Sequence, residues 1–386
     1  MLSFETLYNE FENTRDLCKF CSDYKSGNTA LRFLLIRSLD KPNLQELCIL
    51  HSLNKDNNFK SLMKNVYLSE VSLQELLDYI ESKRKSLIEQ RQSELQGLTE
   101  ILEDFPVVNC GVRNDKIDDI IKQLVRNKTI KSFDKLESQI SDTVLPKIHQ
   151  YLLWSYYNQT TNDLIEMFFL SHPSIIPTLR KIPNIDFFIK INGEIIPFDL
   201  KFTHISEEYF DIYSTLISID PLAKDDFESG DYIKESQIIK TFYSQNKRRL
   251  NLPNFGSLSK KEMLDALMIS HDSFAIKFVK KRTMHRSHDV ACTIKDPHCL
   301  EWWNYKFQGE RLFCNNNRFF IFLTWKDKFL DGRILKGRIE PIGRQVTKLL
   351  DNFSYADLHT IHYHYDKLAA LSGDYTATAI STIYSE

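Results

Sequence analysis

The sequence lacks several features that would place it directly in a functional class. Its 386 residues include 50 Lys and Arg against 52 Asp and Glu, which gives a net charge of −2. The chain therefore lacks the excess of basic residues that many nucleic-acid-binding proteins have. The N-terminal stretch has neither a basic segment nor an apolar core, so we expect no secretory signal. Apolar runs such as Phe319 to Leu323 are too short to cross a bilayer. Any basic binding surface must therefore be local, and we expect no membrane partner.

Cysteine is also scarce, and motifs for nucleotide binding are missing. The seven cysteines are an odd number and are scattered along a long chain, which argues against a disulfide framework and favours a reducing compartment. We find no Gly-rich phosphate-binding loop of the ATPase type and no Gly-rich dinucleotide loop, so we expect no nucleotide cofactor. These absences together favour an intracellular protein of the cytoplasm.

The apolar pattern divides the chain into two regions. Residues 1–143 show helical periodicity throughout, most clearly from Ser72 to Asp104, and form a helical region for recognition, dimerisation or regulation. Residues 144–386 alternate helix and strand signals, which predicts an α/β (α+β) domain with a mixed sheet flanked by helices. Within it we expect helices at Thr161–Leu170 (with a capping box from Thr160 to Asp163), Asp231–Leu250 and Gln345–Asn352, and strands at Ser273–Val279, Arg318–Trp325 and Arg338–Ile342.

A β-hairpin is the strongest local signal. The dipeptide Asn192-Gly193 separates two alternating runs, and a type I′ turn needs positive φ at both central residues, which Asn and Gly tolerate best. If these two residues form the turn, Ile191 lies opposite Glu194. Counting outward by the same register places Asp186 opposite Asp199, at a position where the side chains stand closest.

Two carboxylates directly opposite each other destabilise an ordinary hairpin. Lys201 lies on the same face as Asp199, two residues further along the strand. A divalent cation between Asp186 and Asp199 would resolve the repulsion, because Mg²⁺ prefers oxygen ligands and keeps several waters. The opposite face is apolar and predicts the core side of the hairpin, with Ile185, Phe187, Ile189, Ile191, Ile196, Phe198, Leu200 and Phe202.

The pattern of an acid, twelve residues, and then Asp-x-Lys resembles the PD-(D/E)xK nuclease superfamily, whose best-known members are type II restriction endonucleases. The first acid stands in "PNID" (Pro183 to Asp186) rather than in adjacent Pro-Asp, and the second half stands in "FDLK" (Phe198 to Lys201). The family often adds a glutamate from the helix before the hairpin, and Glu166 in "NDLIEMFF" occupies that place. Glu166 lies among apolar residues, where an unpaired charge is costly, although a simple salt bridge would also explain it.

The resemblance implies a restriction endonuclease-like domain that hydrolyses DNA phosphodiester bonds with Mg²⁺. Asp186, Asp199 and Glu166, with the main-chain carbonyl of Leu200, would be metal ligands. Lys201 would position or deprotonate the attacking water. The leading interpretation is a type II site-specific deoxyribonuclease that acts on double-stranded DNA as a homodimer. A structure-selective repair or resolution nuclease, a phage-defence nuclease of the same fold, and a non-catalytic DNA-binding protein remain as alternatives.

Basic residues for DNA contact gather in the catalytic half of the chain. The nucleic-acid-binding candidates lie on the Asp231–Leu250 helix and just after the 273–279 strand: Lys240, Lys247, Arg248, Arg249, Lys281, Arg282 and Arg286. The insertion at about residues 283–317 is longer than a usual connection and is rich in Arg and Asn, including the run Asn315-Asn316-Asn317. Because Arg and Asn read base edges well, we expect this insertion to contribute DNA recognition.

Three groups of cysteine and histidine have spacings that suggest zinc. Cys18-x-x-Cys21 and Cys48-x-x-His51 fall in Leu-rich helical sequence, where buried structural cysteine is the better interpretation. The His residues 359, 362 and 364 read as a surface or packing group. The better zinc candidate is the cluster within residues 285–314, with His285, His288, Cys292, His298, Cys299 and Cys314.

Overall fold

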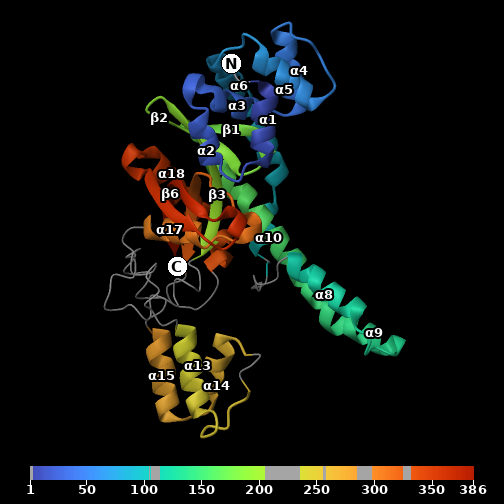
Figure 1. Cartoon of the computed structure of the whole chain (residues 1–386), viewed down its shortest axis with the longest axis vertical. Coiled ribbons are helices and arrows are strands. Elements are labelled where there is room, and N and C mark those ends of the chain that lie inside the picture. Colours follow the sequence, from blue (N-terminus) through green and yellow to red (C-terminus); the bar gives the residue numbers. More distant parts are fainter. Residues whose placement is uncertain are drawn as a thin grey trace. The chain divides into compact units, whose positions relative to one another are not determined.

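The computed structural model describes residues 3–103, 105, 114–204, 235–254, 258–284, 298–324 and 332–386. These residues form an α+β protein with one mixed sheet of six strands in the order β1-β2-β3-β4-β6-β5 (Figure 1). The pairs β1–β2, β2–β3 and β5–β6 are antiparallel. The strands are β1 (Ile175–Ile182), β2 (Ile185–Ile191), β3 (Glu194–His204), β4 (Arg318–Thr324), β5 (His359–Tyr365) and β6 (Gly373–Ser385).

Helices fill the N-terminal region, as the sequence predicts. The expected Ser72–Asp104 helix is divided in two near Gly97, which has a φ of +79°. Ser72 and Glu75 form a capping box at its start, because each side chain accepts a hydrogen bond from the main-chain N–H of the other. The helices are α1 (Phe4–Asn13), α2 (Leu17–Asp23), α3 (Thr29–Arg37), α4 (Lys41–Leu50), α5 (Phe59–Leu68), α6 (Leu73–Leu95), α7 (Leu98–Glu103), α8 (Asn114–Arg126), α9 (Phe133–Gln139) and α10 (Leu145–Leu170).

The chain divides into two compact units. The first contains Met1–Phe202, Gln308–Ile321 and Arg333–Thr382, and the second contains Thr203–Phe307, Phe322–Gly332 and Ile383–Glu386. This division does not follow the boundary expected at residue 143. The reason is a shared core: the N-terminal helices bury their apolar faces together with the sheet residues Ile176, Ile182, Ile185 and Phe188.

The remaining helices lie after the hairpin. In the second unit, α13 (Glu235–Asn246), α14 (Lys260–Ile269) and α15 (Ser273–Met284) have a core of their own, and α17 spans His298–Lys306. In the first unit, α18 spans Ile339–Asp351. Short 3₁₀ turns lie at Ser26–Asn28, Glu310–Leu312, Gly332–Gly337, Tyr355–Asp357 and Ala369–Leu371, and a π-helical turn at Ile140–Val144 precedes α10.

The strand expected at Ser273–Val279 is wrong, because this segment begins α15. Asp272 caps the helix by accepting a hydrogen bond from the N–H of Ala275 at 2.9 Å. Ala275 and Val279 are buried one helical turn apart, and Phe278 stacks on Phe242 of α13 with ring centroids 3.7 Å apart. A short apolar run does not distinguish a strand from a buried helix, and here packing against α13 and α14 decides.

Two further expectations are corrected in the same way. The strand expected at Arg338–Ile342 lies mostly in α18, whose buried Ile339, Ile342, Val346 and Leu350 recur at helical spacing. The helix expected to begin near Thr161 is the end of the much longer α10, so Thr160 is buried within the helix and does not cap it. The strands β1, β5 and β6 had not been predicted, although β5 alternates buried Ile361, Tyr363 and Tyr365 with histidines in the period-2 pattern of a strand.

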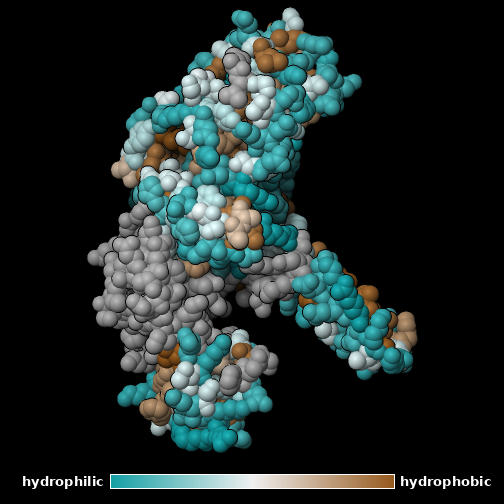
Figure 2. Space-filling view, in the orientation of Figure 1, coloured by the Kyte–Doolittle hydropathy of each residue, from teal (hydrophilic) through white to brown (hydrophobic). Residues whose placement is uncertain are grey.

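The outer surface of the described residues is largely hydrophilic in the view of Figure 2, with apolar side chains gathered along α8 and α9. Among them, Val125 is 72% exposed and Phe133 is 71% exposed. Within the described ranges, none of the helices combines the length and the apolar character that crossing a membrane requires.

Candidate active site

The turn and the register of the hairpin are those predicted. Asn192 and Gly193 both have positive φ, at +46° and +85°. Ile191 lies opposite Glu194, and the ladder continues outward to Phe187 opposite Phe198. It ends there, one residue before the two carboxylates. In this register the N–H of Asp199 faces away from β2, and it donates to the carbonyl of Asn317 on the β4 side at 3.0 Å.

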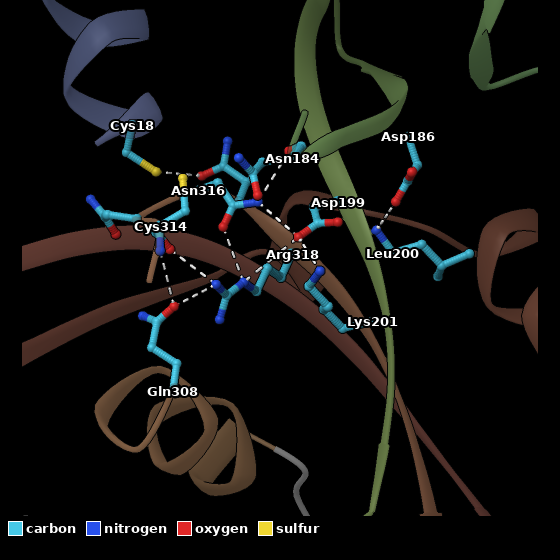
Figure 3. Close-up of polar contacts among 12 residues, drawn as sticks. Cys18, Asn184, Asp186, Asp199, Leu200, Lys201, Gln308, Cys314, Asn316 and Arg318 are labelled. Carbon is cyan, nitrogen blue, oxygen red and sulfur yellow. Dashed lines mark hydrogen bonds and ion pairs between the residues drawn. The ribbon is translucent and has the colours of Figure 1, made fainter. Parts of the chain in front are cut away.

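The side chain of Asp186 bonds to β3 at the point where the ladder between β2 and β3 ends. Its Oδ2 accepts a hydrogen bond from the main-chain N–H of Leu200 at 2.7 Å, so the two hairpin strands are joined through a side chain (Figure 3). Burial raises the pKa of Asp186 to about 7, and the negative charges of Asp199 and Glu166 act in the same direction. Among the described residues, Oδ1 of Asp186 has no hydrogen-bond partner, and it is not fully sealed from solvent.

Asp199 lies deeper and is surrounded by donors. It is 5% exposed. Its Oδ2 lies 2.8 Å from Nζ of Lys201, 2.9 Å from Nδ2 of Asn316 and 4.0 Å from Nε of Arg318. Figure 3 shows this oxygen at the centre of the contacts, with the other carboxylate oxygen turned away from them. The charge of Asp199 is therefore compensated by direct contacts with side chains, whereas among the described residues the carboxylate of Asp186 accepts only the hydrogen bond from Leu200.

Glu166 lies near the end of α10, close enough to raise the pKa of Asp186. Burial is the main cause that raises the pKa of Glu166 itself; the positive charge of Lys181 lowers it and the negative charge of Asp163 raises it. Lys181 lies 3.6 Å from Asp163. In the described part of the chain, no hydrogen bond or ion pair reaches the carboxylate of Glu166. The simple salt bridge considered from the sequence is therefore not present there.

Lys201 and Leu200 complete the predicted set. The side chain of Lys201 is 43% exposed while its ammonium pairs with Asp199. Leu200 is 8% exposed, and its N–H serves Asp186. The structure thus pairs Lys201 with Asp199, and the charges of Asp199, Lys201 and Glu166 all act on Asp186, while their membership of one site stays a prediction. Ligation by the carbonyl of Leu200 stays a prediction.

Asn316, Arg318 and Gln308 were not predicted as members of this site. The Asn run had been read as a base-contacting surface, but Asn315 is 1% exposed and Asn316 is 2% exposed. Asn315 bonds to Asp16 at 2.7 Å, and Asn316 bonds to Asp199. These two side chains are therefore buried away from any DNA. The sequence signal that could have raised this possibility is the position of the run directly before the buried strand β4.

The site offers carboxylate oxygens, which are the ligand type that a magnesium ion prefers. Mg²⁺ binds through one or two carboxylates and several waters. Asp186 and Glu166 each have oxygens without partners among the described residues, and the negative charges of Asp199 and Glu166 add to burial in raising the pKa of Asp186. A cation held by Asp186 and Asp199, with Glu166 nearby, would relieve this repulsion. The described residues contain no cluster of three or more His, Cys, Asp or Glu already gathered as a metal site. A bound Mg²⁺ would keep several waters of its own.

The residues predicted as zinc candidates are either buried cysteines or lie outside the described part of the chain. Burial raises the pKa of Cys21 to about 12 and that of Cys18 well above its usual range, which favours the neutral thiol rather than the thiolate that zinc requires. Cys48 and Cys314 are buried in the shared core. His285, His288 and Cys292 lie outside the described residues, and the side chains of His298 and Cys299 are not described.

The nucleic-acid-binding candidates are divided by their contacts. Arg249 is held by Asp272 through two bonds of 2.6 and 3.0 Å, and Lys247 bonds to Asn254. Lys240 and Arg248 are exposed. Arg286 and the side chains of Lys281 and Arg282 lie outside what the structure describes. Comparisons with family models, with curated proteins and with solved structures find no match to this chain.

Proposed function

We propose that the chain is a Mg²⁺-dependent endonuclease that hydrolyses DNA phosphodiester bonds. One observation carries the proposal: Asp186 and Glu166 are carboxylates with raised pKa values and with oxygens that lack partners among the described residues, and Asp186 also feels the charges of an Asp199–Lys201 pair. Ordinary structural carboxylates at such depth are paired or fully hydrogen-bonded. Perturbed carboxylates that gather beside an exposed ammonium are typical of a catalytic site.

The proposed roles follow from the contacts of each residue. Asp186, Asp199 and Glu166 would hold the metal, which when bound supplies a Lewis acid for the scissile phosphate and the leaving oxygen. Lys201 has a partly exposed side chain whose ammonium can hold a water by hydrogen bonding and orient it for attack on phosphorus. Arg318 and Asn316 occupy Oδ2 of Asp199, which leaves Oδ1 as its open ligand oxygen.

The architecture is compatible with the same proposal. A mixed sheet carries the acids on two of its adjacent strands, and α10 precedes them and contributes Glu166. This is the arrangement that the resemblance to PD-(D/E)xK nucleases implies, and we propose a restriction endonuclease-like domain on that basis. We further propose a type II enzyme that recognises a specific sequence in double-stranded DNA as a homodimer.

The direct test is cleavage of a supercoiled plasmid by the full chain with Mg²⁺, with Mn²⁺ and with EDTA. We expect discrete fragments that depend on the divalent cation. A smear, or cleavage restricted to branched substrates, would instead favour a structure-selective or defence nuclease of the same chemistry. DNA binding without cleavage under any of these cations would mean a non-catalytic DNA-binding protein and would overturn the proposal.

DNA contact by Lys240 and Arg248 is expected to appear in the salt dependence of binding. Each phosphate contact contributes about 0.9 to the slope of log K against log salt concentration, so the double variant Lys240→Ala/Arg248→Ala should lower that slope by about 1.8. Binding is measured with EDTA present, so that cleavage does not interfere. The matched control is Lys85→Ala/Lys122→Ala, which removes the same charge from exposed positions of α6 and α8. Equal slopes for both double variants would remove Lys240 and Arg248 from the DNA-binding surface.

A further inference from the structure

The segment that leads into β4 and ends at its first residue contacts both the main chain and the side chain of Asp199. Its three asparagines and one arginine, Asn315 to Arg318, are consecutive in the chain. Asn317 accepts the main-chain N–H of Asp199 through its carbonyl at 3.0 Å. Asn316 donates to the side chain of the same residue. One short run thus holds both the backbone and the carboxylate of Asp199.

Asn316 is fixed at both ends of its amide. Its Nδ2 donates to Oδ2 of Asp199 at 2.9 Å and to the carbonyl of Asn184 at 3.1 Å. Its Oδ1 accepts from Nε of Arg318 at 3.1 Å. These contacts determine the orientation of the amide, because only Nδ2 can donate to the carboxylate and to the carbonyl. The donor is therefore already aimed at Asp199.

Arg318 in turn fixes Asn316. It is 4% exposed, and its Nη2 donates to Oε1 of Gln308 at 2.7 Å and to the carbonyl of Cys314 at 3.0 Å (Figure 3). The guanidinium is planar and rigid, so bonds at Nη2 determine where Nε points. Nε points to Asn316 and lies 4.0 Å from Oδ2 of Asp199, which places a buried positive charge behind the carboxylate.

The side-chain contacts that Asn316, Arg318 and Lys201 make with Asp199 all involve its Oδ2. Among the described residues, Oδ1 of Asp199 has no hydrogen-bond partner, yet it is not sealed from solvent. We propose, on the basis of the proposed function, that Asn316 and Arg318 are positioning residues: they hold Oδ2 of Asp199 so that Oδ1 is presented to the metal. Outer partners of this kind orient metal ligands and determine how well the site binds.

The adjacent Asn315 provides a closely matched control. It is as buried as Asn316 and also bonds to a carboxylate (Asp16, 2.7 Å), a carbonyl (Thr376, 3.1 Å) and a donor (Tyr363, 3.1 Å). None of these partners belongs to the candidate site. Replacing either asparagine by alanine removes a similar set of buried hydrogen bonds, so a purely structural role predicts the same behaviour for both variants.

The experiment measures Mn²⁺ binding to the full chain by electron paramagnetic resonance, without DNA, alongside plasmid cleavage. We expect Asn316→Ala to weaken Mn²⁺ binding and cleavage by about 10–100-fold. Asn315→Ala should change Mn²⁺ affinity less than about 3-fold, even where thermal unfolding shows an equal loss of stability. Equal Mn²⁺ affinity in the two variants would overturn the positioning role.

A second comparison covers the case in which Asn316→Ala does not fold. Arg318→Lys keeps a donor group but loses the planar guanidinium that bonds Gln308, the carbonyl of Cys314 and Asn316 at once, whereas Arg318→Met keeps no donor at all. We expect the loss of Mn²⁺ affinity to be smaller for lysine than for methionine, and wild-type affinity in Arg318→Met would overturn the inference. If the wild-type chain neither binds Mn²⁺ nor cleaves DNA, both this inference and the proposed function fail. If it does both and the variants match their controls, the positioning role alone fails.

Discussion

Replacing Asp186 by asparagine is expected to lower metal-dependent DNA cleavage by more than about 100-fold, because loss of a ligand should exceed the effect of losing an outer partner. The asparagine can still accept the hydrogen bond from Leu200, so the junction between β2 and β3 is kept. The loss would therefore arise from the missing charge at the metal. Cleavage rates and Mn²⁺ affinity of the two proteins provide the measurement.

The same substitution should stabilise the fold at alkaline pH. The pKa of Asp186 is raised to about 7 from a usual value of 3.8, so the folded state binds its proton more tightly than the unfolded state. Between about pH 4 and pH 7 the folded state then holds more protons, and the contribution of Asp186 to stability falls as the pH rises through this window. Because asparagine does not ionise, we expect the free energy of unfolding at pH 8 to increase by about 1–3 kcal/mol in the variant.

Adding Mg²⁺ at pH 8 should stabilise the wild type relative to Asp186→Asn, which is opposite in sign to the effect of the substitution alone. A ligand that binds only the folded state stabilises it, so Mg²⁺ should raise the melting temperature of the wild type at pH 8 and leave that of Asp186→Asn nearly unchanged. Glu194→Gln is a suitable control, because Glu194 lies at the turn end of β3, five residues before Asp199 along the extended strand, and its carboxylate bonds to Tyr355 and Lys25. Full cleavage by Asp186→Asn, or its destabilisation at pH 8, would contradict the assignment of a charged metal ligand.

Replacing Lys201 by methionine is expected to lower cleavage by about 10²–10⁴-fold, the range for loss of a group that positions or deprotonates the nucleophile. Metal binding should respond differently. Lys201 lies 2.8 Å from Oδ2 of Asp199, and its removal leaves the carboxylate more negative and no less open to a cation. We therefore expect Mn²⁺ affinity in Lys201→Met to equal or exceed that of the wild type.

This split between binding and cleavage separates the roles of the two residues. Asp186→Asn should lose both, whereas Lys201→Met should lose cleavage alone. Lys190→Met is the matched control, since Lys190 is an exposed lysine on the adjacent strand β2. A parallel loss of Mn²⁺ binding in Lys201→Met would mean that the lysine maintains the site structurally, and unchanged cleavage would exclude it from catalysis.

Much of the hairpin could be predicted because its information is local. Asn192 and Gly193 tolerate positive φ, the alternating apolar residues choose a buried face, and together they determine the register as far as Phe187 and Phe198. Where the signal was a short apolar run alone, as at Ser273–Val279 and Arg338–Ile342, strand and helix were not distinguished. The cap at Asp272 and the packing of Ala275 and Val279 made the first of these a helix.

The candidate site also combines features that local sequence predicts with features that only packing determines. By itself, the sequence determined the acids, the lysine and the turn that brings Asp186 near Asp199, since these depend on neighbours within one hairpin. Only the tertiary structure decided that the ladder stops before the two acids and that Asp199 is compensated by Asn316 and Arg318, more than a hundred residues away in the chain. Such partners are chosen by which strand lies beside β3, and that adjacency results from burial of the whole sheet rather than from any pattern near Asp199.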